Sequence, residues 1–310
     1  MKVEYIIDNL LFKGERLVIA GQPGASKSTF VTQLAIALAT GGEYGDLPGN
    51  PTCKKLHRIY LFDGENNEHV MQMRYHALPE FHNLHRITDC DCFGTYIDLL
   101  EYIYGIVTTE QTDIVIILDN LTSLLPPILP DEARTFMRGL EKIAGIAERL
   151  GYSVTYIVVT HTVKNFNLKE LSESSVSGPT NICRFADRID IMCVPTPREV
   201  AIYNIKCRNG VADMVPILIP TLEPYLHLVP SKSIPISKWK SYVGQKESFS
   251  EPATTEEQKP RGKVTEDVRT RVSELHEKGF SYQQISKTLE AEQLADISKQ
   301  TVGNIINGKA

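Results

Sequence analysis

The feature that most constrains this chain is a loop of small residues between an apolar strand and an apolar helix. The strand is expected at 16–20 and the helix at 30–38. Such a loop turns successive backbone N–H groups and the positive helix end toward one anion, so it binds phosphate. A lysine at its end meets the β- and γ-phosphates, and the next hydroxyl ligates Mg²⁺. We therefore predict a site for ATP and Mg²⁺ at Gly21, Gln22, Pro23, Gly24, Ala25, Ser26, Lys27, Ser28 and Thr29.

One position of this loop departs from the pattern G-x-x-x-x-G-K-[S/T]. Ser26 stands where the second glycine is expected. A β-carbon there restricts the backbone and can crowd a phosphate. We expect the departure to lower hydrolysis more than nucleotide binding, with Lys27 as the catalytic cation and Ser28 as the metal ligand. The alternative interpretation is an ordinary turn before a helix.

Further apolar runs predict a parallel sheet. Residues 58–62, 114–118 and 154–159 are almost continuously apolar, as expected for strands that are buried on both faces. Between the last two, apolar residues recur at steps of three and four from Asp131 to Gly151, which predicts a helix. The fold class is therefore α/β, with a mostly parallel sheet flanked by helices.

Two polar side chains follow these strands at the edge where the loop lies. Asp119 ends the run at 114–118, the place at which P-loop enzymes hold a Mg²⁺-bound water. Its alternative role is to cap the following helix. His161 follows the run at 154–159, where a polar side chain can sense the γ-phosphate. A single histidine is otherwise more often structural.

A carboxylate just past the strand at 58–62 is a candidate to orient and deprotonate the attacking water. Glu65 stands there, and Asp63 and Glu68 are rivals at nearly the same place. The chemistry of the residues alone leaves the choice among the three open.

Residues 188–194 and 200–206 flank a turn with two prolines and predict a late β-hairpin. Lys206 and Arg208 stand near its end, two residues apart. Alternate residues of a strand point to the same face, so both cations could reach one anion. The alternative is a solvated strand edge that its charges protect from pairing.

Composition limits the class of protein. The 310 residues carry 33 basic and 38 acidic side chains, a formal net charge of −5. This charge does not draw the whole molecule onto nucleic acid, so any DNA contact must come from a local surface. No apolar run has the length of a membrane-spanning helix, and we expect a cytoplasmic protein without membrane contact. The six cysteines are expected to be reduced thiols.

Together these segments resemble the RecA-type ATPases, and specifically the RepA-like and DnaB-like hexameric replicative helicases. The resemblance covers residues 5–215, from "ERLVIAGQPGASKSTF" to "IKCRNG". It implies that Glu65 is the catalytic carboxylate and that Asp119 belongs to the Mg²⁺ site. It also implies that His161, followed by Lys164, is a sensor.

The same resemblance implies that Lys206 and Arg208 act on the ATP of a neighbouring subunit, in a homo-hexamer or another ring or filament. DNA, single-stranded or forked, would contact loops at 121–130 and 165–180, with Lys164 and Lys169 beside the second. The second loop is rich in Ser and Gly and is expected to be mobile, or simply to be a surface loop.

Composition also divides the chain. We predict an ATPase domain at 1–230, a flexible linker at 231–262 and a small all-α domain at 263–310. The last segment is similar to the helix-turn-helix of resolvases and invertases. From 261 to 310 the chain has eight basic and seven acidic residues, a net charge of +1, so a protein-docking bundle is the alternative to a DNA reader. The helix-turn-helix resemblance gives its DNA contacts as Lys299, Gln300 and Asn304, with Asn307 a further candidate.

Three functions remain open from the sequence. The first is an oligomeric ATP-dependent DNA helicase or translocase that serves replication of a plasmid or mobile element. The second is a RadA-like recombination or regulatory ATPase that binds DNA without unwinding it. The third is a DNA-binding regulator that uses ATP only as an assembly switch.

Overall fold

The computed structural model describes residues 4–7, 10–42, 58–66, 68–76, 79–125, 130–177, 181–210, 212–222, 225–243, 266–277, 281–291 and 299–306. The chain divides into two compact units, Met1–Glu247 and Ser248–Ala310. Each unit is described by itself.

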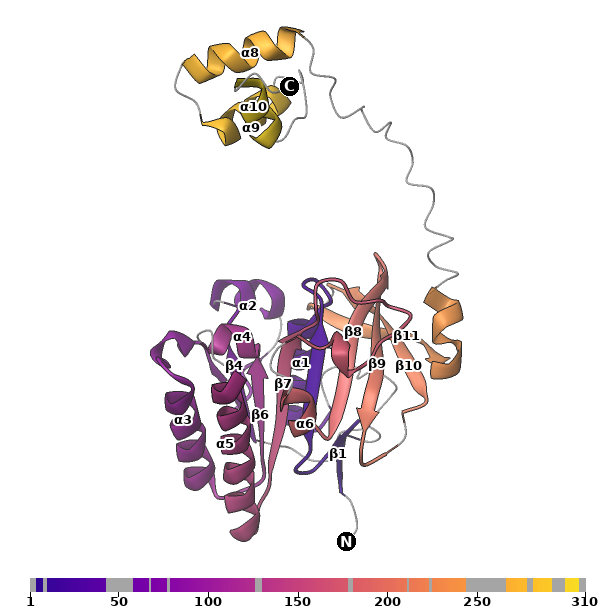
Figure 1. Cartoon of the computed structure of the whole chain (residues 1–310). Coiled ribbons are helices and arrows are strands. Elements are labelled where there is room, and N and C mark those ends of the chain that lie inside the picture. Colours follow the sequence, from indigo (N-terminus) through magenta and orange to yellow (C-terminus); the bar gives the residue numbers. More distant parts are fainter. Residues whose placement is uncertain are drawn as a thin grey trace. The chain divides into compact units, whose positions relative to one another are not determined.

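The first unit is built on a mostly parallel sheet (Figure 1). Its described residues form nine strands in the order β11-β10-β9-β8-β3-β7-β6-β4-β5. The strands from β8 to β5 run parallel, and β9, β10 and β11 continue the sheet in antiparallel fashion. Their bounds are β3 (Arg16–Gly21), β4 (Arg58–Asp63), β5 (Leu84–Ile87), β6 (Ile114–Asp119), β7 (Val154–His161), β8 (Arg188–Thr196), β9 (Glu199–Cys207), β10 (Met214–Thr221) and β11 (His227–Pro235). The predicted fold class, with its late hairpin β8–β9, is confirmed.

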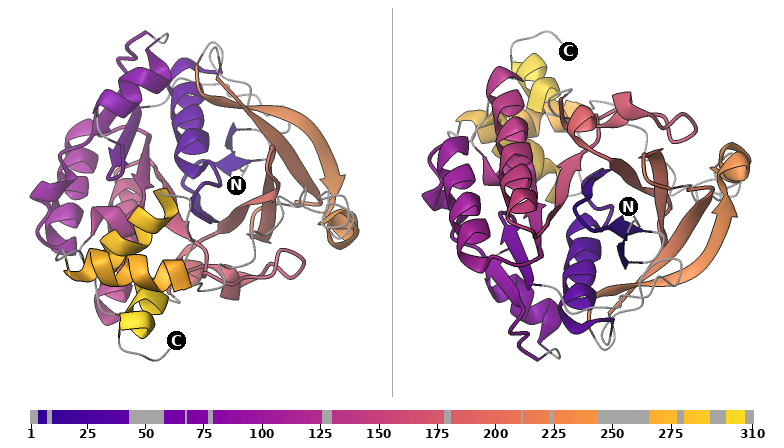
Figure 2. Two further views of the ribbon diagram at one scale, coloured as in Figure 1. Left: turned by 90° about the horizontal axis from the view of Figure 1, so that it is seen from above. Right: turned by 90° about the horizontal axis from the view of Figure 1, so that it is seen from below.

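Helices cover both faces of this sheet (Figures 1 and 2). One face holds α1, and the other holds α3, α5 and α6. Alternate residues of each strand supply the two cores, so that Val18 lies in the core shared with α3, α5 and α6 while Leu17 lies in the core shared with α1. The helix bounds are α1 (Lys27–Thr40), α2 (Glu68–Tyr75), α3 (Tyr96–Glu110), α4 (Leu121–Leu124), α5 (Pro130–Arg149) and α6 (Asn181–Phe185).

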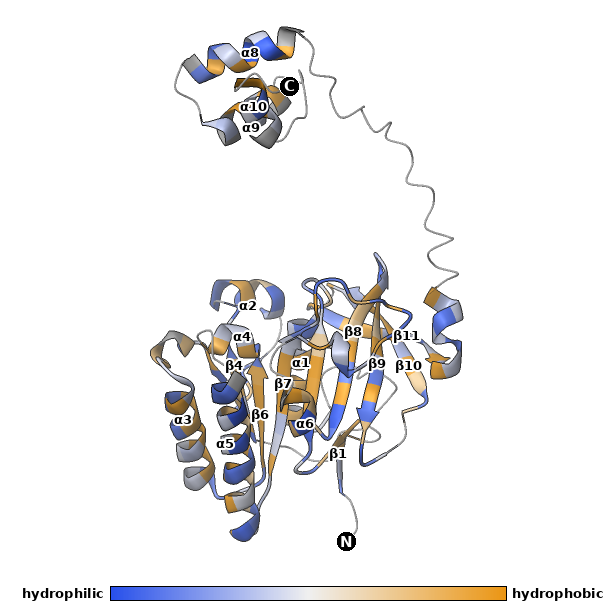
Figure 3. Cartoon of the chain, in the orientation of Figure 1, coloured by the Kyte–Doolittle hydropathy of each residue, from blue (hydrophilic) through white to orange (hydrophobic). Residues whose placement is uncertain are grey.

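The sequence dictates these elements locally. The central strands are mostly apolar, whereas α5 has one apolar and one charged face (Figure 3). Gln33 of α1 is buried, and its amide exchanges two 3.0 Å hydrogen bonds with the backbone of Leu228, which fastens β11 to the helix. A short ribbon of β1 (Tyr5–Ile7) and β2 (Leu11–Phe12) precedes the sheet. The described cysteines are free thiols.

The second unit contains α8 (Glu266–Glu277), α9 (Tyr282–Ala291) and α10 (Lys299–Ile306). Apolar side chains one helical turn apart meet in a core of their own, as the periodicity of the sequence predicts. This core contains Val268, Val272, Leu275, Ile285, Leu289, Val302 and Ile305. None of the helices in the described part of the chain is long and apolar enough to cross a membrane.

The boundary predicted at 230 falls inside β11. The strand continues to Pro235, a 3-10 helix follows at Ile236–Lys238, and residues 239–243 are helical. Trp239 is only 1% exposed, and its indole N–H donates a 2.7 Å hydrogen bond to the carbonyl of Leu168. Residues 231–243 therefore belong to the first unit and not to a linker, because a few large apolar side chains suffice to anchor an otherwise polar segment.

We expect Trp239→Ala to destabilise the first unit by about 3–5 kcal/mol, because it empties a packed site and leaves a buried carbonyl without its donor. Chemical denaturation followed by circular dichroism measures this cost. Lys240→Ala, an exposed neighbour, is the control and should change stability by less than about 0.5 kcal/mol. A chain ended at 230 should unfold far more easily than one ended at 247. Equal stability of the two would assign 231–247 to a linker after all.

Candidate active site

The phosphate loop joins the carboxyl end of β3 to the first turn of α1. At its start, a β-carbon on Gly21 would lie 2.7 Å from the carbonyl oxygen of Met192 on β8, so only glycine fits. At its end, Lys27 is buried and folds back, donating 3.0 Å hydrogen bonds to the carbonyls of Gly21 and Gln22. Burial lowers the pKa of Lys27, while the charges of Glu65 and Asp119 oppose this effect. The ammonium of Lys27 is thus held inside the loop, where a phosphate group could bind it.

Ser26 takes the left-handed conformation that a glycine at its position would adopt freely. Its φ is 59° and its ψ is 28°, and its carbonyl accepts the first helical hydrogen bond, from the N–H of Phe30, at 2.9 Å. For a residue with a β-carbon this conformation costs about 1–2 kcal/mol. The loop therefore keeps the shape of a phosphate loop at a cost in backbone strain.

Asp119 ends β6 beside the loop and is nearly inaccessible to solvent. Burial raises its pKa from 3.8 to about 7. A hydrogen bond from Ser28 and the charge of Lys27 lower the pKa, and the charges of Asp63 and Glu65 raise it. Its Oδ1 has no hydrogen-bond partner among the described residues. An unpaired buried carboxylate oxygen next to the Ser28 hydroxyl fits Mg²⁺, a hard cation that binds one or two protein oxygens together with phosphates and water.

Asn120, which the sequence reasoning did not single out, joins two of the predicted residues. Its side-chain amide donates to Oε1 of Glu65, and the same nitrogen lies 3.3 Å from Nε2 of His161. Its carbonyl oxygen caps α4 by accepting from the backbone N–H of Ser123 at 3.1 Å. Asn120 is fully buried, so Glu65 and His161 are held at one fixed point. The only signal in the sequence is its place directly after Asp119.

The two rivals of Glu65 are engaged elsewhere. Asp63 is buried and pairs with Arg86, with its Oδ2 3.0 Å from Nη2, and Arg86 also pairs with Glu68 at 2.9 Å. The Oδ1 of Asp63 accepts from the backbone N–H of Glu65 at 3.2 Å. Asp63 thus shapes the turn that presents Glu65, whose charge acts on both Lys27 and Asp119.

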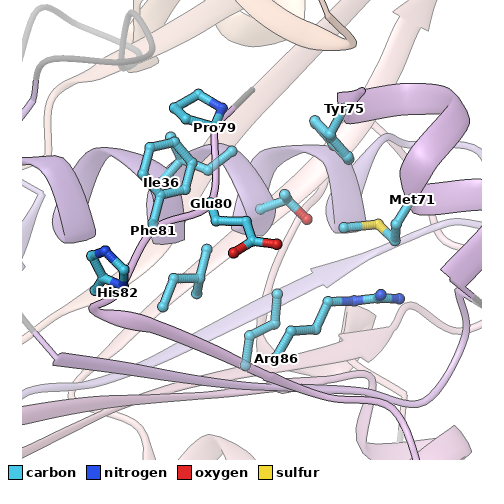
Figure 4. A pocket seen from close by; sticks show the side chains of 11 residues that line it. Ile36, Met71, Tyr75, Pro79, Glu80, Phe81, His82 and Arg86 are labelled. Atoms are coloured by element: carbon cyan, nitrogen blue, oxygen red, sulfur yellow. The ribbon is translucent and has the colours of Figure 1, made fainter. Parts of the chain in front are cut away.

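Arg86 also lines a cavity of about 340 Å³ between α1, α2 and β5 (Figure 4). Ile36, Phe81 and Leu84 give this cavity an apolar wall, and Glu80 points into it. The cavity lies beside the turn that carries Glu65 and does not contain the residues of the phosphate loop.

Lys206 and Arg208 lie together, as their spacing predicts, but not near the phosphate loop. The ammonium of Lys206 donates to the carbonyl of Cys183 and the guanidinium of Arg208 to that of Arg184, at 3.4 Å, so both meet the last turn of α6. Arg208 also pairs with Asp187 at 3.1 Å. These contacts place both cations at the edge of the sheet where β3 and β8 begin.

The predicted DNA contacts lie in two places, on the segment after β7 and on α10. Lys164 is exposed on the segment after β7, and Lys169 is half-buried there. This segment is not a free loop, since Phe166, Leu168 and Leu171 pack on the cluster around Trp239. Of the two predicted loops, residues 126–129 and 178–180 lie outside the described residues. Asn304 is exposed on α10, whereas Asn307 and the side chains of Lys299 and Gln300 lie outside the described part.

Comparisons with known proteins agree with this geometry. Residues 2–166, more than half of the chain, match the model of a family described as AAA domain. The chain belongs to this AAA domain family. It contains a RecA-type P-loop ATPase domain, and the match spans the phosphate loop, Glu65, Asp119 and His161. No curated protein matches its sequence.

Two solved structures are similar to this AAA protein. A DnaB-like replicative helicase, described together with its interactions with primase, is 13% identical, with a TM-score of 0.51 over 71% of this chain and 58% of that one. A KaiC-like protein of the hyperthermophilic archaeon Pyrococcus horikoshii is 15% identical, with a TM-score of 0.49 over 73% of this chain and 94% of that one. The fold is RecA-like, with a mostly parallel sheet between layers of helices.

Glycine at position 26 should stabilise the protein by about 1 kcal/mol, because it removes the β-carbon from a left-handed residue. We also expect Ser26→Gly to raise the rate of ATP hydrolysis more than the affinity for ATP. Thermal unfolding and steady-state ATPase assays measure the two effects. Ser26→Ala is the matched control, since it removes the hydroxyl but keeps the β-carbon, and should bring no gain. Equal gains from both variants would contradict the role given to the β-carbon.

Asp119 should make the nucleotide-free protein less stable as the pH rises. Its folded pKa of about 7 lies above its unfolded value, so the folded state binds the extra proton. Relative to Asp119→Asn, the wild type should lose roughly 1 kcal/mol per pH unit between about pH 4 and pH 7, and no more above that range. Denaturant titrations at pH 5 and pH 8 measure this difference. A difference that is independent of pH would argue against a buried carboxyl.

Proposed function

We propose that the protein is an oligomeric ATP-driven DNA helicase or translocase of RepA-like type, acting in the replication of a plasmid or mobile element. The observation that carries the proposal is the position of Arg208. Gly21 lies level with Met192 and Ile202, whereas Cys207 lies level with Arg188 and with the start of β3. Five strand residues, about 17 Å, therefore separate Arg208 from the phosphate loop of its own chain.

A cation so far from the nucleotide in its own subunit is well placed to serve the nucleotide of another. Lys206 and Arg208 leave the same edge side by side, held by the end of α6 and by Asp187. An arginine supplied by a neighbour stabilises the charge of the phosphoryl-transfer transition state and raises the rate by roughly 10³ to 10⁵. The site is then complete only in a ring or filament, for which a homo-hexamer is our proposal.

Each residue of the subunit's own site has a chemical role in hydrolysis. Lys27 binds the β- and γ-phosphate oxygens, and Glu65 orients and deprotonates the attacking water. Ser28 and Asp119 would hold Mg²⁺, which neutralises developing charge on the phosphates. Asn120 positions Glu65 and lies against His161, so a change at the γ-phosphate felt by His161 can reach the catalytic carboxylate.

DNA contact is assigned to two places. Lys164 and Lys169 stand on the segment that leaves β7 directly after His161, so DNA held there lies one short segment from the ATP site. The three-helix unit is proposed as a helix-turn-helix module that reads duplex DNA with α10. Asn304 is exposed on this helix, and Lys299, Gln300 and Asn304 are the candidate contacts.

One observation favours a second candidate function. The strained conformation of Ser26 keeps the shape of the loop but places a β-carbon where phosphate approaches. A chain that binds ATP and hydrolyses it slowly would suit a DNA-binding regulator that uses the nucleotide as an assembly switch. An ATPase assay with and without single-stranded DNA separates the two, because a translocase is stimulated by DNA and a switch is not.

Arg208→Ala should lower ATP hydrolysis by at least about 10³ while ATP binding stays intact, because only the transition state loses a contact. Mixing this variant with Glu65→Gln should restore part of the activity, since each protein brings what the other lacks to a shared interface. Arg198→Ala, at the exposed turn of the same hairpin, should leave activity unchanged. Failure to restore activity under conditions of subunit exchange would contradict action in trans.

The helicase activity is tested with a forked DNA substrate. The wild type should separate the strands when ATP and Mg²⁺ are present, and Glu65→Gln should bind the fork without separating it. Light scattering on the same samples gives the size of the assembly. A protein that hydrolyses ATP in response to DNA but leaves the fork intact would favour the RadA-like alternative, and an obligate monomer would overturn the ring.

A further inference from the structure

A pocket of about 390 Å³ opens between residues of α5 and α6. Both helices lie on the face of the sheet opposite α1 (Figure 1). Two arginines one helical turn apart on α5, Arg134 and Arg138, stand on one side, and Arg184 of α6 stands on the other. The remaining lining residues are Met137, Glu141 and Phe185. No residue of the phosphate loop lines this pocket. From these residues we infer that the pocket binds the phosphate groups of a single-stranded DNA backbone, an inference that rests on the proposed function.

The charges in the pocket are not neutralised within the described part of the chain. Glu141 pairs with Arg16 at 2.7 Å, so its charge is already engaged. Arg134 meets Asp131 at 3.3 Å, but both side chains are more than half exposed, and such surface pairs contribute little. For Arg138 and Arg184, no acidic partner is found among the described residues. Unpaired guanidinium groups on two walls of one pocket leave it with an excess of positive charge, in a chain whose net charge is −5.

The chemistry of the lining selects the ligand. Guanidinium is always charged, and its planar donors match the oxygens of phosphate. The floor, in contrast, is closed, since Met137 is 3% exposed and Phe185 is 2% exposed. A base or nucleoside would find no open ring on which to stack there. The pocket therefore suits a phosphodiester backbone read without regard to sequence, and not a free nucleotide.

The segments next to the pocket link it to the two activities that we propose, DNA binding and ATP hydrolysis. The chain reaches α6 from the segment that bears Lys164 and Lys169. The carbonyl of Arg184 accepts from Arg208, and that of Cys183 accepts from Lys206. A phosphate bound by Arg184 thus acts on the same short helix that holds the cations proposed for the next subunit's ATP. DNA binding in the pocket would stimulate hydrolysis through α6.

The test uses the full chain with the double variant Arg138→Gln and Arg184→Gln. Binding of a fluorescent oligothymidylate is measured by anisotropy over a range of salt concentrations. We expect the affinity at low salt to fall at least about tenfold. The slope of log affinity against log salt should become shallower by about 1.4, because each lost phosphate contact on a single strand accounts for about 0.7. Stimulation of the ATPase by DNA should fall.

The matched control is a double variant of equal charge, Arg149→Gln with Arg198→Gln, two exposed arginines outside the pocket. Its salt slope should equal that of the wild type. An unchanged slope in the pocket variant overturns the inference alone, and so does an equal change in the control. Loss of the assembly in the pocket variant, seen by light scattering, would make the pocket a contact between subunits and would also overturn it. A wild type that fails to bind oligothymidylate at low salt would overturn the proposed function together with the inference.

Discussion

The parallel pairing of β3 with β7 and β8 is the interaction on which the rest of this structure depends. Parallel strands end at the same edge, so the phosphate loop after β3, Asp119 at the end of β6 and His161 at the end of β7 meet without any of them being close in the sequence. Gly21 shows how tight this pairing is, because the carbonyl of Met192 leaves no room for a β-carbon there. The order of the strands therefore brings the residues of the candidate active site together.

Burial gives that edge its electrostatic character. Lys27 and Asp119 are both withdrawn from water, and burial disfavours the charged form of each, lowering the pKa of the first and raising that of the second. An unpaired carboxylate oxygen and a confined ammonium are unfavourable in the free protein. In our proposal a metal ion and phosphates would give both groups a partner, so binding would offset the cost of burying them. Two hydrogen bonds hold Glu65 beside these groups. The side-chain amide of Asn120 donates to its carboxylate, and the backbone N–H of Glu65 donates to Asp63.

The reversal of direction at β9 gives the opposite edge its function in our proposal. The antiparallel return carries Lys206 and Arg208 back to the start of β3, away from the nucleotide of their own chain. There they meet α6, and α6 faces the arginines of α5 across a pocket. One edge therefore holds the groups to which we assign the binding and cleavage of ATP, and the other holds the cations that we assign to the ATP of a neighbouring subunit. In our proposal the ATP of a neighbouring subunit is the anion that Lys206 and Arg208 bind. The DNA backbone is the anion that the arginines of α5 and α6 bind.

The sequence by itself determined the phosphate loop, the apolar strands, the amphipathic helices and the core of the second unit, because each depends on residues that are close along the chain. Periodicity placed Val272, Ile285 and Val302 inward, as the structure has them. Composition, in contrast, predicted a linker at residues 231–243, which belong to the first unit, because an average over the segment hides the single buried tryptophan that anchors it. Only the tertiary structure showed that Asp63 pairs with Arg86, revealed Asn120 between Glu65 and His161, and brought Arg138 to Arg184. Those relations join residues tens of positions apart, and the pairing of strands and the packing of helices decide them, not any local pattern.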